Sequence, residues 1–220
     1  MVGVFDVLGP IMIGPSSSHT AGAVRIGRVA RAILGDRVSR ARILLHGSFA
    51  DTYRGHGTDR ALAAGLLGYA TDDERIRQAL DIAGREGMEL SFERADLGAV
   101  HPNTALLFLT SPSGRRVEVM GSSVGGGSIV ISRINGFEVE LTGEYNTLLT
   151  VHQDRKGVIA AVTAILAAAD INIAFMRVSR KERGATALML IEVDQPIAGE
   201  VLEEIRALPA VEQAMMIEPQ

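Results

Sequence analysis

In the first part of the chain, segments with apolar residues at helical spacing alternate with short continuous apolar runs. This pattern predicts helices over 20–35, 58–68 and 72–86 and strands over 41–48 and 88–94. Polar segments at 14–20 and 51–57 precede the first two helices, and we expect both segments to be loops. The order of elements therefore places a polar loop directly before a helix twice.

Short strands separated by turn residues occupy the middle of the chain. Asn135-Gly136 is the strongest short-range signal for a two-residue type I′ hairpin, and Ser111-Pro112-Ser113-Gly114 also suits a tight reversal. The expected strands run over 104–110, 116–120, 128–134 and 137–141. Three glycines, Gly125–Gly127, lie between the second and third of these strands. They form either a bulge or wide turn, or a loop whose backbone can approach a ligand closely.

The pattern restarts after residue 146 as β-α-β-β-α-β, the order of a ferredoxin-like split βαβ fold. Its strands are expected over 147–152, 172–179, 185–193 and 211–217, and its helices over 157–169 and 198–207. Both parts mix helices with largely antiparallel strands. We therefore predict an α+β protein with two domains, 1–142 and 147–220.

Composition excludes several functional classes. The 220 residues carry a net charge of −4 with scattered basic residues, which argues against a nucleic-acid partner. No apolar stretch reaches the roughly 18–20 residues of a membrane span, and the N-terminus lacks signal-peptide features, so we expect a cytoplasmic protein without a membrane partner. The absence of cysteine excludes disulfides, cysteine nucleophiles and a cysteine-held iron–sulfur cluster on this chain. No histidine spacing matches a zinc motif, so no metal site is expected.

The first polar segment reads Ser16-Ser17-Ser18-His19-Thr20 and directly precedes a predicted helix. The free N–H groups and the positive end of the helix dipole can hold an anion such as a carboxylate there. The alternative is that one hydroxyl simply caps the helix and that the histidine is an exposed loop residue.

The second polar segment, Gly55-His56-Gly57-Thr58-Asp59, repeats the arrangement. An accessible histidine with a near-neutral pKa can accept or give a proton, and two such loops could converge on one ligand. The alternative is a glycine-rich turn with an N-cap. His101-Pro102-Asn103-Thr104 is a third, weaker polar cluster, and His46, inside the predicted strand 41–48, is interpreted as a packed, hydrogen-bonded histidine.

Taken in order, these segments and the glycine run resemble the β subunit of bacterial iron–sulfur-dependent L-serine dehydratase. The tail resembles an ACT domain, so the resemblance spans the whole chain. It implies an N-terminal domain like the allosteric substrate-binding domain of some phosphoglycerate dehydrogenases. It also implies conversion of L-serine to pyruvate and ammonia together with an α subunit, whose cysteines hold the 4Fe–4S cluster. The lack of cysteine in this chain agrees with that division.

The resemblance also implies site residues. The implied catalytic residues are His19, His56, Thr58 and Asp59, and the implied substrate-binding residues are Ser16, Ser17, Ser18, Thr20, His101 and Asn103. Which histidine is the base stays open. A non-catalytic amino-acid-sensing module of a phosphoglycerate-dehydrogenase-like enzyme is the competing interpretation, but a pure sensor has no need for both histidine-bearing segments.

In the tail, the segment from His152 to Gly157 resembles the amino-acid-sensing turn of ACT domains. The implied effector-binding residues are His152, Asp154, Gly157 and Asn172. Asp154 stands where the family often has Asn, and an acid there would repel a ligand's carboxylate, which makes serine a weaker candidate effector. The sheet of this domain is expected to pair with a second copy of itself through an exposed edge.

Overall fold

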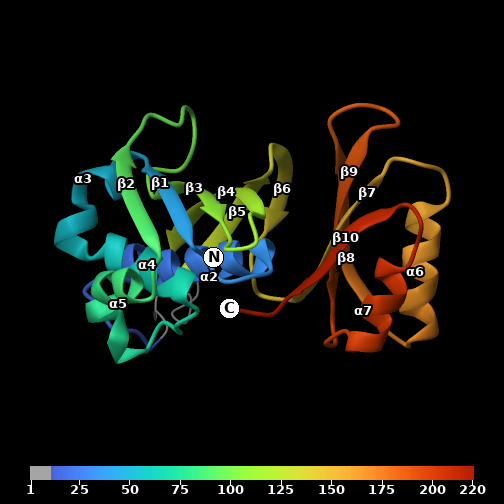
Figure 1. Cartoon of the computed structure of the whole chain (residues 1–220), viewed down its shortest axis with the longest axis horizontal. Coiled ribbons are helices and arrows are strands. Elements are labelled where there is room, and N and C mark those ends of the chain that lie inside the picture. The colour runs from blue at the N-terminus through green and yellow to red at the C-terminus, as the bar shows by residue number, and fades with distance from the viewer. Residues whose placement is uncertain (1–10) are drawn as a thin grey trace, which may run out of the picture. The chain divides into compact units, whose positions relative to one another are not determined.

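The computed structural model describes residues 11–220 and confirms the α+β class (Figure 1). The chain divides into two compact units after Gly136. The domain limits expected from the sequence, 1–142 and 147–220, stay predictions. Within residues 11–220 no helix has both the length and the apolar character needed to cross a membrane.

A six-stranded sheet begins in the first unit and has the order β2-β1-β3-β4-β5-β6. Its strands are β1 Arg40–Leu45, β2 Glu89–Arg94, β3 Thr104–Thr110, β4 Arg116–Gly125, β5 Ser128–Ile134 and β6 Phe137–Leu141. Strands β1 and β2 are parallel, and β3 pairs antiparallel with both β1 and β4. Every expected strand is present, although β1 ends at Leu45 because His46 caps the helix that begins at Gly47.

The helices of the first unit differ from the expectation at the two polar segments. They are η1 Ser17–Ala21, α2 Gly22–Leu34, α3 Gly47–His56, α4 Thr58–Leu67, η2 Glu74–Gln78 and α5 Ala79–Arg85. The prediction of a loop over 14–20 is wrong from Ser17 onward, because η1 is a π-helical turn continuous with α2. The loop expected over 51–57 is also wrong, because α3 continues to His56 and only Gly57, with φ 73°, separates it from α4. The helix expected over 72–86 is divided into η2 and α5.

The glycine run lies in the hairpin between β4 and β5. The register of this pair shifts twice, between Met120 and Gly121 and between Ser123 and Gly125, which are irregularities typical of bulges. All three glycines of the run have positive φ, from 59° to 116°. The turn interpretation is therefore confirmed for this segment.

Two glycines bring the backbones of α2 and α4 into contact. A Cβ added to Gly65 would lie 2.2 Å from the carbonyl oxygen of Val24, and one added to Gly27 would lie 2.7 Å from the carbonyl oxygen of Leu62. The obstructing atoms belong to helix backbone, which cannot move as a side-chain tip can. This crossing fixes the relative positions of the helices that follow Ser16 and Gly57.

We expect Gly65→Ala to lower the free energy of unfolding of the first unit by roughly 1–3 kcal/mol or more, because the added methyl group overpacks the helix crossing. Gly84→Ala in α5 is the matched control, since a Cβ there meets no atom within 4 Å. Denaturant titration of both variants measures the difference. Equal unfolding midpoints for the two variants would contradict the backbone contact.

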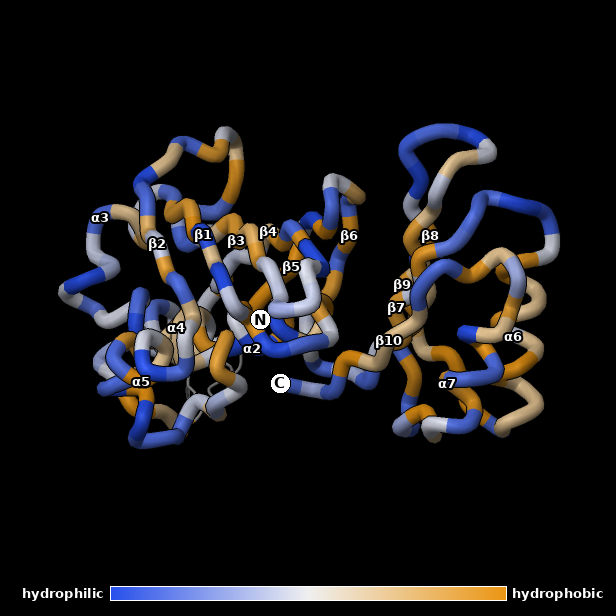
Figure 2. The backbone as a smooth tube through the Cα atoms, viewed as in Figure 1, coloured by the Kyte–Doolittle hydropathy of each residue, from blue (hydrophilic) through white to orange (hydrophobic). Residues whose placement is uncertain are grey.

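The second unit is the expected βαββαβ fold. Its elements are β7 Asn146–Gln153, α6 Val158–Ala168, β8 Ile173–Arg180, β9 Thr186–Val193, α7 Gly199–Arg206 and β10 Val211–Ile217. The sheet has the order β10-β7-β9-β8 with every neighbouring pair antiparallel. Along the chain, α6 is mostly hydrophobic and the hairpin tip between β8 and β9 is hydrophilic (Figure 2).

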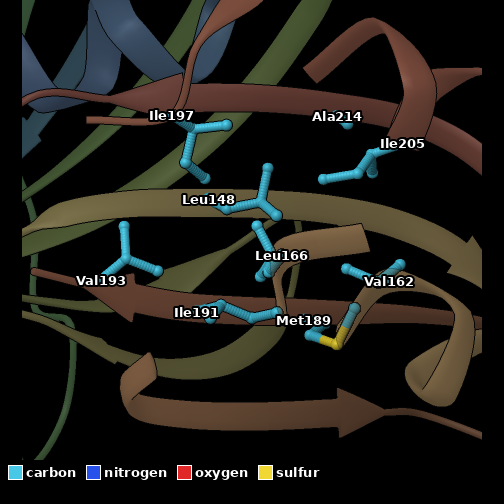
Figure 3. Packing of buried hydrophobic residues seen from close by; sticks show 9 residues of the cluster. All are labelled: Leu148, Val162, Leu166, Met189, Ile191, Val193, Ile197, Ile205 and Ala214. Atoms are coloured by element: carbon cyan, nitrogen blue, oxygen red, sulfur yellow. The ribbon is translucent and has the colours of Figure 1, made fainter. Parts of the chain in front are cut away.

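Helices α6 and α7 cover one face of this sheet and form a hydrophobic core with it (Figure 1, Figure 3). The core consists of Leu148, Val162, Leu166, Met189, Ile191, Val193, Ile197, Ile205 and Ala214. Alternate residues of β9 point into this core, as the period-2 pattern of a strand requires.

Candidate active site

The turn before α2 holds His19 in a fixed orientation. Ser16 has an extended backbone, and its hydroxyl accepts a hydrogen bond from the backbone N–H of His19 at 3.2 Å. The imidazole contacts the Ser16 hydroxyl through Nδ1 at 3.3 Å and the Ser48 hydroxyl through Nε2 at 3.1 Å. The capping interpretation is thus confirmed for Ser16, and the same cap positions the histidine. With a partner at each ring nitrogen, the ring cannot rotate without losing a contact.

His56 lies beside this histidine although the two are far apart in the sequence. Their ring centroids are 4.7 Å apart with an angle of 79° between the ring planes, and the Phe49 ring centroid also lies 5.4 Å from that of His19. His56 is the last residue of α3 and is exposed, because the left-handed Gly57 ends the helix there. The two polar segments therefore converge in space.

Burial lowers the pKa of His19 below its ordinary value, and the positive charge of a protonated His56 lowers it further. The contact with Ser48 acts in the opposite direction. A lowered pKa keeps the imidazole neutral at neutral pH, which is the form that can accept a proton.

A cavity of about 480 Å³ opens beside His56. Its volume lies in the range typical of small-molecule sites. The described residues that line it are Ile13, Gly14, Pro15, Thr20, His56, Gly57, Arg60, Ile76 and Arg77. Thr20 is only 2% exposed. Two arginines and a histidine make this cavity electropositive when the histidine is protonated, which suits an anionic ligand.

Two other predicted catalytic residues occupy the first turn of α4 but are not among the described residues that line the cavity. Thr58 is fully buried, and its hydroxyl has no hydrogen-bond partner within residues 11–220. Asp59 is nearly buried, and burial raises the pKa of its carboxyl group, while the backbone N–H of Arg60 donates to it at 2.8 Å and opposes that shift. Neither residue caps α4 with its side chain.

The cluster at 101–104 supports the start of α3. His101 is exposed, and its Nδ1 accepts a hydrogen bond from the backbone N–H of Asn103 at 3.1 Å. Pro102 packs so closely on Gly47 that a Cβ there would lie 2.8 Å from the proline carbonyl oxygen. Since α3 carries Ser48, this cluster has an indirect connection to His19. The direct substrate-binding role predicted for His101 and Asn103 stays a prediction, as do those of Ser17 and Ser18, which are half-buried on η1.

His46 is hydrogen-bonded, as expected, but it does not lie inside a strand. It follows β1 and takes the N-cap position of α3 with an extended backbone. Its Nδ1 accepts a hydrogen bond from the backbone N–H of Leu97 at 3.2 Å. The expected strand to residue 48 was too long because the chain turns into α3 here.

The sequence analysis missed four residues that the fold brings to this region. Ser48 contacts His19, Phe49 packs against it, and Arg60 and Arg77 line the cavity. Arg60 is four residues after His56, a spacing that could have drawn attention to it. Nothing in the sequence near Ser48 or Arg77 indicates their proximity to the histidines.

In the second unit, Asp154 is engaged within the chain. Its Oδ2 accepts hydrogen bonds from the backbone N–H of Gly184 at 2.9 Å and from Arg180 Nη1 at 2.7 Å, and these lower the pKa of its carboxyl group. The arginine offsets the charge that would repel a ligand's carboxylate. His152 is buried and burial lowers its pKa, while Gly157, with φ 89°, precedes α6.

Asn172 lies apart from this turn within one chain. Asn172 directly precedes β8, whose first residue pairs with Val193, the last residue of β9. Asp154 directly follows β7, whose last residue pairs with Thr186, the first residue of β9. The two residues therefore lie at opposite ends of the sheet. The side-chain amide of Asn172 donates to Asp194 Oδ2 at 2.7 Å. The effector-binding roles of these four tail residues stay predictions.

Residues 11–220 contain no group of three or more His, Cys, Asp or Glu side chains that could hold a metal ion. The chain also lacks cysteine. Its residues therefore do not form a ligand set for a 4Fe–4S cluster.

Comparison with known proteins gives two matching families. Residues 3–83 match the family described as serine dehydratase beta chain, and residues 146–210 match the ACT domain. The second match agrees with the βαββαβ unit. The two regions define a protein in which a serine dehydratase β region is followed by an ACT domain.

Individual relatives extend this match over nearly the whole chain. The chain is 49% identical over 214 residues to a probable L-serine dehydratase beta chain of Bacillus subtilis. It is 38% identical over 215 residues to the L-serine dehydratase beta chain of Peptoniphilus asaccharolyticus. Each alignment covers 97% of this chain and 97% of the relative. A D-3-phosphoglycerate dehydrogenase of Archaeoglobus fulgidus is 27% identical over 199 residues, which are 89% of this chain and 37% of that protein. The chain belongs to the L-serine dehydratase beta-chain family.

Proposed function

We propose that this chain is the substrate-binding and proton-transferring half of a two-subunit L-serine dehydratase, which converts L-serine to pyruvate and ammonia. The observation that carries the proposal is the pairing of His19 and His56, with ring centroids 4.7 Å apart, beside a cavity that suits a small anionic ligand. An amino acid carries the carboxylate that such a cavity attracts. Its α-proton requires a base within hydrogen-bond reach.

The chain's residues have distinct roles in this proposal. His56 lines the cavity and accepts the α-proton of serine on its neutral imidazole. His19, held between Ser16 and Ser48, stays neutral because of burial and contributes to orienting its neighbour. The β-hydroxyl then departs with the proton that His56 accepted, which gives water and an enamine. The enamine becomes an imine and is hydrolysed in water to pyruvate and ammonia. Removing the proton in a positioned complex lowers the barrier to this elimination.

In this proposal the 4Fe–4S cluster is held by the partner α subunit. The donor set of this chain does not fit a 4Fe–4S cluster, since cysteine is absent and residues 11–220 hold no group of three metal-ligating side chains. A cysteine-bearing α subunit would supply its ligands. The chain alone should therefore bind no iron–sulfur cluster and form no pyruvate.

Reconstitution tests this function. The purified chain, the cysteine-bearing α subunit from the same genome and their mixture are compared under anaerobic conditions for iron content and for pyruvate formed from L-serine. We expect activity only in the mixture, with iron in the α subunit. Pyruvate formation by the metal-free chain alone would refute the division of roles, and an iron-loaded but inactive mixture would refute the dehydratase function.

The similarity to a D-3-phosphoglycerate dehydrogenase over 89% of the chain supports a second candidate function, in which the chain is a regulatory module that senses an amino acid. Such a module would bind L-serine without consuming it. Binding of serine to the assembled complex, measured together with the absence of pyruvate, would favour this second function.

A further inference from the structure

The cavity beside His56 contains two arginines that come from different elements. Arg60 lies in α4 and Arg77 in η2, and both are exposed. Within residues 11–220 neither guanidinium group has a hydrogen-bond or ion-pair partner. The nearby carboxylate of Asp73 is already occupied by Arg75 at 2.6 Å. The Asp59 carboxylate interacts with Arg60 through its charge, but no hydrogen bond or ion pair from the described residues holds either guanidinium group, so both can turn to a ligand in the cavity.

A buried hydroxyl at the same cavity also lacks a partner. Thr20 is 2% exposed, and its Oγ1 has no hydrogen bond within the described chain. Gly14 packs on it so closely that a Cβ at Gly14 would lie 2.4 Å from Oγ1. Leaving a buried hydroxyl unsatisfied costs free energy, and a ligand oxygen in the cavity would satisfy it.

We propose that Arg60 and Arg77 bind the carboxylate of the amino-acid substrate in this cavity, with the Thr20 hydroxyl as a third donor. This deepens the proposed function and rests on it. Guanidinium groups form paired hydrogen bonds to the two oxygens of a carboxylate. A carboxylate anchored between them leaves the α-carbon directed toward His56, which lines the same cavity. The arginines thereby position the proton for transfer without taking part in it.

Kinetics of the reconstituted complex test the roles of the arginines. Arg60→Gln and Arg77→Gln should each raise KM for L-serine roughly tenfold or more, the loss expected for one charge-assisted hydrogen bond, and change kcat by less than about threefold. Arg85→Gln is the matched control, because this arginine is exposed on α5 and does not line the cavity. Unchanged KM in both cavity variants would overturn the proposal. Thermal unfolding of each variant checks that the fold is intact.

Two competitive inhibitors identify which part of serine the arginines bind. Propionate has the carboxylate without the amine and hydroxyl, and ethanolamine has the amine and hydroxyl without the carboxylate. Both arginine variants should raise the inhibition constant of propionate roughly tenfold or more and leave that of ethanolamine unchanged. Equal changes for both inhibitors, or no inhibition of the wild-type complex by propionate, would overturn the assignment to the carboxylate.

A binding measurement on the full chain separates this proposal from the function on which it rests. Saturation-transfer NMR with propionate should give a signal for the wild-type chain and for Arg85→Gln, and none for the double variant Arg60→Gln/Arg77→Gln. If the complex makes no pyruvate but this difference is observed, the dehydratase function fails and the carboxylate site stands. If the complex is active but the signal is the same for all three proteins, the carboxylate site fails alone.

Discussion

Replacing His56 with alanine is expected to lower kcat of the reconstituted complex by roughly 10²-fold or more, because a positioned general base contributes about 10²–10⁴-fold to such a reaction. The side chain is exposed at the end of α3, so its removal should not affect folding. His19→Ala should lower kcat by a similar factor, since its ring lies 4.7 Å from that of His56 and contributes to orienting it. The measurement is steady-state pyruvate formation at saturating serine.

The pH profile separates the roles of the two histidines. The activity of a general base rises with pH through its own pKa, because only the neutral form accepts the proton. The positive charge of His56 lowers the pKa of His19, so removing that charge should raise it. If His19 is the base, the acidic limb of the residual activity of His56→Gln moves to higher pH. If His56 is the base, the residual activity of this variant loses that limb.

His46→Ala is the control for a structural histidine. It removes the acceptor of the Leu97 backbone N–H, and should lower the free energy of unfolding by about 1–3 kcal/mol while leaving kcat of the folded protein near the wild-type value. Wild-type kcat and KM in both His19→Ala and His56→Ala would show that these residues do not face the substrate.

Elements with strong periodicity or distinctive turns could be predicted from the sequence. Helix α2, the Asn135-Gly136 hairpin and the βαββαβ order all follow from local patterns, and the positive φ values of 49° and 75° in that hairpin suit its type I′ turn. Helix α3 could not be predicted in the same way. It contains two glycines and several polar residues, and its stability comes from tertiary contacts such as the full burial of Phe49.

The site could be predicted only in part for the same reason. The two histidine-bearing segments were recognisable because each combines a histidine with turn residues before a helix. The contact between His19 and Ser48, 29 residues apart, depends on the path of α3 and therefore has no local signal. The buried glycine contact between α2 and α4 is likewise a tertiary feature, since a glycine within a helical pattern does not reveal what packs on it.

The second large effect is expected at the edge of the ACT domain. Strand β8 is an edge strand of its sheet and exposes Phe175, Met176 and Val178. An edge strand with exposed apolar side chains is a template for pairing with another strand. We propose that β8 pairs with β8 of a second copy of this chain, and that this pairing allows an effector bound near Asp154 to change the activity of the complex.

Deleting residues 147–220 is expected to lower the mass of the reconstituted complex, because the pairing strand is lost. The deletion should also change the response of the complex to serine. An allosteric coupling of about 1–3 kcal/mol corresponds to a change of roughly 5–150-fold in the half-saturating concentration. Light scattering measures the mass, and pyruvate formation over a range of serine concentrations measures the response. Unchanged mass together with unchanged kinetics would refute the regulatory role, and unchanged mass alone would refute only the pairing.

A single substitution tests the pairing without removing the domain. Met176→Lys places a charge on the exposed edge, where lysine opposes the approach of a second strand. It should reproduce the mass change of the deletion while leaving the ACT fold intact. Tyr145→Lys adds the same charge at an exposed position before β7 and is the matched control. Because β8 lies at the sheet edge and Tyr145 precedes a central strand, a complex of full mass with Met176→Lys would mean that the copies do not pair through β8.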